Sequence, residues 1–97
     1  MARGYWVANV AVEDLGEYMK YVQANGLAFA KYGGRFLVRG GRHEVVEGRM
    51  GERIVVIEFP DYEAAVACYE SPEYRAAMKF REGHARANLA IVEGWEG

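Results

Sequence analysis

Apolar residues along the chain change their spacing several times, and each spacing predicts a different element. Aromatic and β-branched residues dominate residues 5–12 and 53–59, which predicts two strands. Another strand is expected over 35–39, continued beyond a glycine pair over about 43–47, and a last short strand over 88–93. These segments together predict a four-stranded sheet.

Between the strands, apolar residues recur at the three- and four-residue spacing of helices. Asp14 and Asp61 stand where a helix N-cap is needed, and Ser71 is placed to cap a further helical segment. An Asn-Gly pair at 25–26 interrupts the first helix, and Gly33 ends it, where a left-handed residue is wanted. The resulting order, β-α-β-β-α-β, is the α+β ferredoxin-like pattern, an antiparallel sheet with helices on one face.

The strands lack the alternation of apolar and polar residues expected when water meets one face of a sheet. Over 53–59, Val55 and Ile57 point to one face while Ile54 and Val56 point to the other. The first strand is apolar on both faces in the same way. An identical sheet is the economical cover for the face without helices, so a homodimer is expected.

Size and charge narrow the classes of partner. The 97 residues predict a single ferredoxin-like domain, 1–97, and the net charge of −2 argues against nucleic acid. No apolar run approaches the roughly 20 residues of a membrane span, and no signal-peptide pattern opens the chain. The one cysteine, Cys68, cannot form an internal disulfide. A cytoplasmic protein without membrane contact is expected.

Three blocks in order carry a resemblance: KYGGRFLVRGG at 31–41, VVIEFP at 55–60 and YESPEY at 69–74. With the opening 4–6 and the closing 91–94, they resemble the domain-of-unknown-function family 1330 over nearly the whole chain. The resemblance implies a dimeric α/β-barrel fold, whose superfamily includes antibiotic-biosynthesis-type monooxygenases, heme-degrading relatives and muconolactone-isomerase-like proteins. It implies no established activity, and no motif of the heme-degrading relatives is matched here.

Two arginines and two aromatic residues are candidates for ligand binding. Arg35 and Arg39 are expected on one strand face, and their guanidinium groups suit carboxylate or phosphate ligands, although pairing with nearby acids is the alternative. The rings of Tyr32 and Trp6 can line a pocket for a flat organic molecule or fill the core or an interface. The glycines at 40–41 predict a bulge or a close approach to the backbone.

Glu58 and His43 are the candidates for catalysis. Glu58 interrupts an apolar strand and needs a partner, which we expect to be Arg35 or Arg39 at the margin of a cavity. The alternative role is that of a general base. His43 follows the glycine pair and can transfer protons near neutral pH. With Glu47 it supplies too few ligands for a metal site, so no metal is expected.

The chain contains no phosphate-binding loop, dinucleotide fingerprint or cysteine-histidine array, so no cofactor is expected. The sequence predicts a small cytoplasmic dimer that binds or transforms a small acidic or aromatic organic molecule without a cofactor. The alternative is a non-catalytic dimeric binding or structural module. A concave pocket where Arg35, Arg39 and Glu58 converge would separate the two hypotheses.

Overall fold

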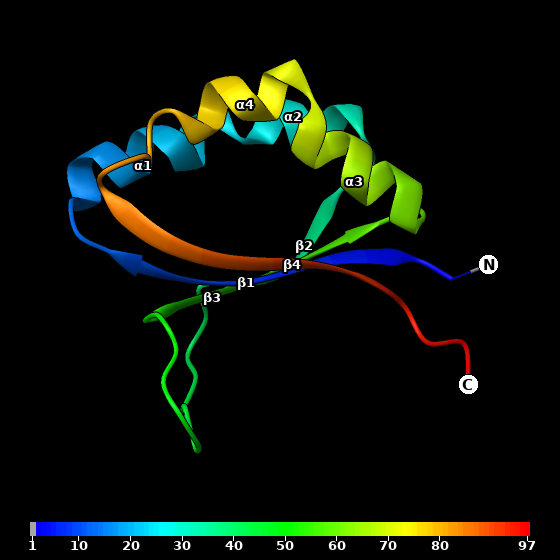
Figure 1. Cartoon of the computed structure of the whole chain (residues 1–97), viewed down its shortest axis with the longest axis horizontal. Coiled ribbons are helices and arrows are strands. Elements are labelled where there is room, and N and C mark those ends of the chain that lie inside the picture. The colour runs from blue at the N-terminus through cyan, green and yellow to red at the C-terminus, as the bar shows by residue number, and fades with distance from the viewer. Residues whose placement is uncertain (1) are drawn as a thin grey trace.

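Residues 2–97, the part that the computed structural model describes, form one antiparallel sheet with all of its helices on one face (Figure 1). The strands are β1 (Gly4–Val12), β2 (Arg35–Arg39), β3 (Arg53–Phe59) and β4 (Ala85–Glu93), in the spatial order β2-β3-β1-β4. The helices are α1 (Leu15–Ala24), α2 (Gly26–Lys31), α3 (Tyr62–Glu70) and α4 (Pro72–Met78). This is the predicted ferredoxin-like order, with each helix of the pattern divided in two.

Side-chain caps start three of the helices as predicted. Asp14 accepts a hydrogen bond from the Glu17 N–H at 3.1 Å to start α1, and Asp61 caps α3 in the same way at 2.7 Å. Ser71 caps α4, and its hydroxyl also donates to the Cys68 carbonyl at the end of α3. No helix within residues 2–97 has both the length and the apolar character to span a lipid bilayer.

The turn from α2 into β2 depends on glycine. Gly33 has φ +76°, the left-handed region that was predicted for this position. An added Cβ would also lie only 3.1 Å from Pro60 Cγ. Any other residue here would therefore meet both backbone strain and a close contact.

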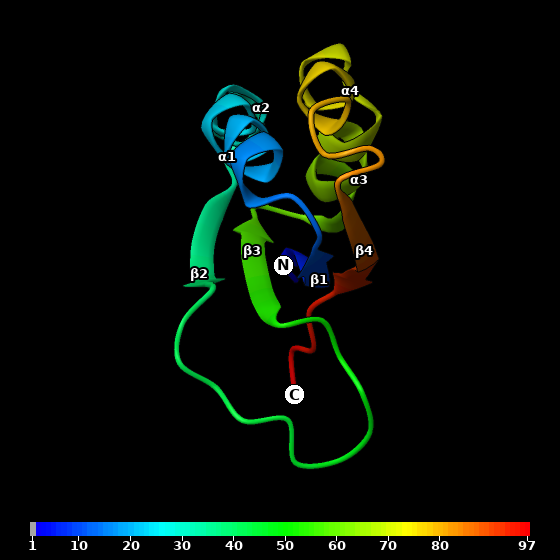
Figure 2. The same cartoon turned by 90° about the vertical axis from the view of Figure 1, so that its left-hand side faces the viewer.

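Two strand boundaries differ from the prediction. Residues 40–52 form no strand, and Figures 1 and 2 show this connection projecting from the side of the sheet opposite the helices. The ladder ends where the Gly40 N–H donates to the Ile54 carbonyl, because the left-handed φ of Gly40 (+66°) turns the chain away. β4 in contrast starts early, at Ala85, because residues 85–87 pair with the end of β1.

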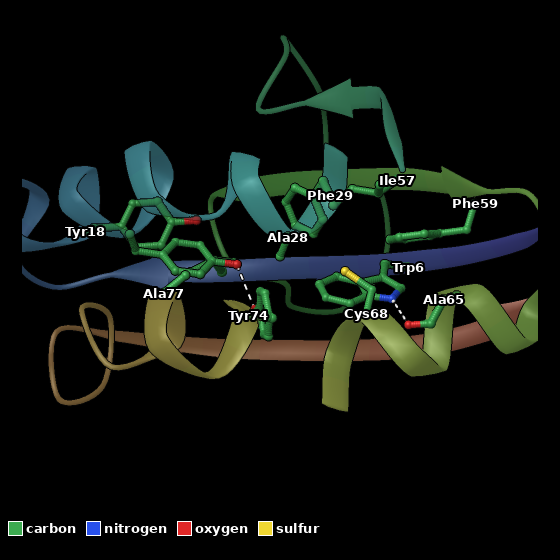
Figure 3. Packing of buried hydrophobic residues seen from close by; sticks show 12 residues of the cluster. Trp6, Tyr18, Ala28, Phe29, Ile57, Phe59, Ala65, Cys68, Tyr74 and Ala77 are labelled. Carbon is green, nitrogen blue, oxygen red and sulfur yellow. Dashed lines mark hydrogen bonds between the residues drawn. The ribbon is translucent and has the colours of Figure 1, made fainter. Parts of the chain in front are cut away.

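The core lies between the sheet and the helices, with Trp6 at its centre (Figure 3). The Trp6 ring lies 4.8 Å from the Tyr74 ring and 5.2 Å from the Phe29 ring, both edge-on, as rings of opposite edge and face charge prefer. Its Nε1 donates to the Ala65 carbonyl at 2.9 Å, which attaches α3 to β1. The polar atom of this buried indole is therefore satisfied.

The other face of the sheet has no helix over it. Trp6 is 1% exposed, whereas its neighbour Val7, which points the other way, is 44% exposed. Val7 pairs with Val56 in the register of β1 and β3, so apolar side chains do occupy the helix-free face as the sequence predicted. We call this surface the open face.

Candidate functional site

Glu58 lies on the open face, where the register places it between Arg35 of β2 and Tyr5 of β1. Arg35 Nε donates to Glu58 Oε1 at 3.1 Å, the Tyr5 hydroxyl donates to Oε2 at 3.4 Å, and Arg3 Nε lies 3.9 Å from Oε2. The predicted pair of Glu58 with an arginine is confirmed. It is a strand-to-strand ion pair on the sheet face away from the helices, and its Arg35 partner is 73% exposed.

Arg39 faces the other way, although simple alternation placed it on the same face as Arg35. The register of β2 against β3 shifts between Phe36 and Val38, as at a β-bulge, and the inserted residue reverses the alternation. The guanidinium carbon of Arg39 lies 4.5 Å from the centre of the Phe36 ring, on the side of the sheet that the helices cover. The expectation that Arg35 and Arg39 share one strand face is therefore wrong, and Arg39 does not lie beside Arg35 and Glu58.

His43 and Tyr32 lie apart from both groups. His43 is exposed in the 40–52 connection, where its Nδ1 donates to the Gly41 carbonyl at 2.9 Å. Tyr32 follows α2, is half-buried against the edge of the core, and has Lys31 Nζ 5.7 Å from its ring centre. The contacts of His43 are those of a loop residue, and those of Tyr32 are packing contacts.

A cavity lies between the sheet and the helices, with a volume of about 30 Å³. All four strands contribute to its wall, together with α1, α2, α4 and the turn after α4. Its aromatic lining consists of Trp6, Tyr18, Tyr21, Phe29, Phe36 and Tyr74. Its polar residues are Asn25, Arg39, Arg53 and Arg81, in addition to the three tyrosines. We call this space the central cavity.

Arg53 reaches the central cavity by passing close to Gly40. A Cβ on Gly40 would lie 2.5 Å from Arg53 Nη1, so the predicted close approach to this glycine pair is confirmed and the approaching group is a guanidinium. The guanidinium carbon of Arg53 also lies 5.8 Å from the centre of the Tyr18 ring. The bulge, the glycine and the first residue of β3 thus combine to direct two arginines toward the cavity.

Two buried polar atoms in the cavity wall have no hydrogen-bond partner among residues 2–97. One is Asn25 Oδ1, an acceptor, on a residue that is 5% exposed; the other is Arg53 Nε, a donor. Leaving such a group unpaired costs about 1–3 kcal/mol, and more when it is charged. Both residues belong to the wall of the central cavity, although the two atoms themselves have almost no accessible surface.

A pair of tyrosines forms another polar group of the cavity. The hydroxyl oxygens of Tyr21 and Tyr74 lie 2.8 Å apart, and Arg81 Nη2 donates to Tyr74 Oη at 3.4 Å. Burial raises the pKa of Tyr21 well above its usual value, and the neighbouring Tyr74 raises it further. Burial also raises the pKa of Tyr18, although Arg53 opposes the shift. Tyr21 and Tyr18 therefore stay protonated at physiological pH and can act as hydrogen-bond donors.

Sequence reasoning missed most of the polar groups in this wall, namely Asn25, Arg53, Arg81 and the tyrosine pair. A signal was present for Asn25 in the helical spacing, because Asn25 lies seven residues after Tyr18 of the same helical segment. Two turns of helix return a side chain to the same face. A polar residue on an otherwise aromatic face indicates a lined cavity rather than a simple core.

Metal ligands and the cysteine thiol are the other groups that can carry chemistry. Within residues 2–97, no cluster of three or more histidine, cysteine, aspartate or glutamate side chains is arranged to hold a metal ion. Cys68 is fully buried, and burial raises the pKa of its thiol to about 12. A thiol with that pKa is not a nucleophile at neutral pH.

Solved structures share this fold over almost the whole chain. A protein of unknown function from Rhodopseudomonas palustris has a TM-score of 0.78 and 19% identity, with 99% of this chain and 85% of that chain covered. SnoaB, a cofactor-independent oxygenase from Streptomyces nogalater, has a TM-score of 0.64 and 14% identity, with 100% and 97% covered. A dimeric ferredoxin-like protein of unknown function from Thermobifida fusca has a TM-score of 0.57 and 12% identity, with 95% and 91% covered.

At these identities the structural likeness establishes the fold alone, and it confirms the predicted ferredoxin-like architecture. Sequence comparison adds a family: residues 3–95 match the domain of unknown function DUF1330, as the three sequence blocks predicted. No curated protein matches the chain in sequence.

Proposed function

We propose that this chain, which belongs to DUF1330, a family of domains of unknown function, binds a small organic molecule in the central cavity without a cofactor. One observation carries the proposal. Asn25 Oδ1 and Arg53 Nε are buried, unpaired and part of an aromatic wall. A ligand that pairs with both would relieve a penalty of about 1–3 kcal/mol for each group.

The aromatic lining favours a flat ligand. Trp6, Phe36 and the tyrosines offer ring faces and edges, which suit an aromatic molecule. The cavity of about 30 Å³ holds roughly two water molecules, so a ring-sized ligand needs the wall to move. Arg39 is exposed on the edge strand β2, and displacement of its side chain from the Phe36 ring is the simplest opening.

The composition of the cavity wall favours ligand binding over catalysis. The lining contains no carboxylate, histidine or thiol, so it has no ordinary general base. Glu58 and His43, the candidate catalytic residues, lie on the open face and in the 40–52 connection. Transformation of the ligand is the second candidate function, supported by the shared fold of a cofactor-independent oxygenase.

We further propose that two copies pack through their open faces. Val38 and Val92 join Val7 there as exposed apolar side chains, each 39–46% exposed. A similar structure is described as a dimeric ferredoxin-like protein, which supports a dimer but does not say which faces meet. A non-catalytic dimeric module is the alternative in which the open face, and not the cavity, carries the function.

A thermal-shift screen of aromatic molecules and organic acids tests the cavity proposal, because a ligand that binds the folded state raises its melting temperature. Arg53→Gln removes the unpaired charged donor, and Arg35→Gln is its matched control on the open face. Ligands are expected to stabilise the wild type and Arg35→Gln but not Arg53→Gln. Equal stabilisation of all three proteins would place the ligand elsewhere and refute the proposal.

A further inference from the structure

The hydroxyl groups of Tyr21 and Tyr74 carry one proton more than their contacts use. They lie 2.8 Å apart, and their mutual hydrogen bond uses one of the two hydroxyl protons. Arg81, which lies 3.4 Å from Tyr74 Oη, has only protons to donate and therefore occupies a lone pair. Among residues 2–97, no further acceptor contacts either hydroxyl.

Both tyrosines belong to the wall of the central cavity and are buried, Tyr21 at 8% and Tyr74 at 0% exposure. The raised pKa of Tyr21 keeps its proton in place at physiological pH. If Tyr74 donates to Tyr21, the Tyr21 proton is left over; if Tyr21 donates to Tyr74, the Tyr74 proton is left over. What this donor lacks is an acceptor among residues 2–97, and a ligand that enters as the wall moves would provide one.

The charges around the cavity have one sign. The charged and titratable groups of its wall are Tyr18 and Tyr21 of α1, Arg39 of β2, Arg53 of β3, Tyr74 of α4 and Arg81 of the following turn. None of the ion pairs found within residues 2–97 involves Arg39, Arg53 or Arg81. Three unneutralised guanidinium groups beside a partly buried space favour an anion.

We propose that the central cavity takes its ligand as an anion: a planar aromatic molecule with one ionised oxygen and, apart from it, a hydroxyl group. The ionised oxygen accepts hydrogen bonds from the spare tyrosine proton and from Arg53 Nε. The separate hydroxyl donates to Asn25 Oδ1, the unpaired acceptor. This inference rests on the proposed function and adds the chemical class and charge of the ligand.

The ionised oxygen can belong to a phenolate or to a carboxylate, and two probes separate these sources. 4-Nitrocatechol reports its ionisation by absorbance, so its apparent pKa can be measured free and bound to the protein. 3-Hydroxybenzoate supplies a carboxylate and a hydroxyl, and its methyl ester is the matched uncharged molecule. We expect the protein to bind the anion of either probe about tenfold more tightly than the neutral form, which for nitrocatechol lowers the bound pKa by one unit.

The double variant Tyr21→Phe/Tyr74→Phe removes both hydroxyls and hence the spare proton. Replacing both partners of a hydrogen bond by apolar groups of the same shape is nearly neutral for folding. Each single phenylalanine variant still has one free hydroxyl proton. We therefore expect the anion preference to survive in part in the single variants and to disappear in the double variant, while Arg35→Gln behaves as the wild type. Arg53→Gln, read in the same assay, is expected to weaken the preference independently.

The outcomes distinguish the two proposals. If the methyl ester binds as tightly as 3-hydroxybenzoate and nitrocatechol keeps its solution pKa, the anion preference is refuted while the cavity remains a binding site. If the double variant retains the full preference, the role of the tyrosine pair is refuted. If none of the three molecules binds, neutral or ionised, the inference falls together with the aromatic-ligand proposal on which it rests.

Discussion

Replacing Asn25 with leucine is expected to stabilise the protein, although it removes a polar side chain. Asn25 is 5% exposed and its Oδ1 has no hydrogen-bond partner among residues 2–97. Removing an unpaired buried acceptor recovers about 1–3 kcal/mol, and leucine has nearly the same shape. The Asn25 backbone is helical, with φ −70° and ψ −20°, so leucine fits it without strain.

Asn9 provides the matched control, since its Oδ1 is fully engaged. It accepts from the Gly51 N–H at 2.8 Å and from Asn88 Nδ2 at 3.2 Å. Asn9→Leu loses both bonds, each of which contributes about 0.5–1.5 kcal/mol, and leaves the Gly51 N–H without this acceptor. The same chemical change is therefore expected to have opposite signs at the two positions.

Thermal unfolding followed by circular dichroism at one protein concentration measures both effects. A change of 1 kcal/mol shifts the melting temperature of a domain of this size by roughly 4–8 °C. We expect Asn25→Leu to melt several degrees higher than the wild type and Asn9→Leu to melt several degrees lower. Asn25→Leu is also expected to lose affinity for the cavity ligand. If Asn25→Leu lowers the melting temperature as much as Asn9→Leu does, the reasoning about an unpaired Oδ1 is wrong.

Three further changes test separate parts of the structure. Glu58→Gln breaks the ion pair with the largely exposed Arg35, so we expect urea unfolding to show a loss of stability of no more than about 1 kcal/mol and ligand binding to stay unchanged. Lost binding at unchanged stability would instead make Glu58 a site residue. Gly33→Ala forces a side chain to φ +76° and is expected to destabilise by about 1–2 kcal/mol, whereas an unchanged melting curve would contradict the strain argument. Val56→Asp places a charge on the open face. In light scattering we expect monomers for this variant and the proposed dimer for the wild type; equal masses for the two proteins would argue against packing through this face.

The features that the sequence predicted correctly are local or follow from strand alternation. Asp14 caps its helix through the N–H three residues ahead, a contact that depends on the neighbouring backbone alone. Gly33 was recognisable because a helical pattern stopped at it. The pair of Glu58 with Arg35 was also predictable, since an unpaired carboxylate in an apolar strand needs a cation from the next strand.

Arg39 shows where this reasoning fails. Alternation placed it beside Arg35, but a single shift of register between Phe36 and Val38 moved it to the helix-covered face. A bulge has a weak signature in one sequence, because it is decided by how two strands pair. The expected strand over 43–47 failed for a related reason: a β-like sequence forms a strand only if a partner strand lies beside it, and Gly40 turns the chain away first.

The sequence by itself determined the order of the elements, the caps and turns that delimit them, and the two apolar faces of the sheet. The caps and turns depend on contacts between residues a few positions apart, and the two faces follow from the alternation of side chains along each strand. Only the tertiary structure decided where the polar site lies. Asn25, Arg53 and Tyr74 come from a helix junction, a strand and a distant helix, and their shared cavity exists only after the sheet and helices have packed. Side-chain chemistry can be read along a chain, but the convergence of unpaired polar atoms depends on packing between segments distant in sequence.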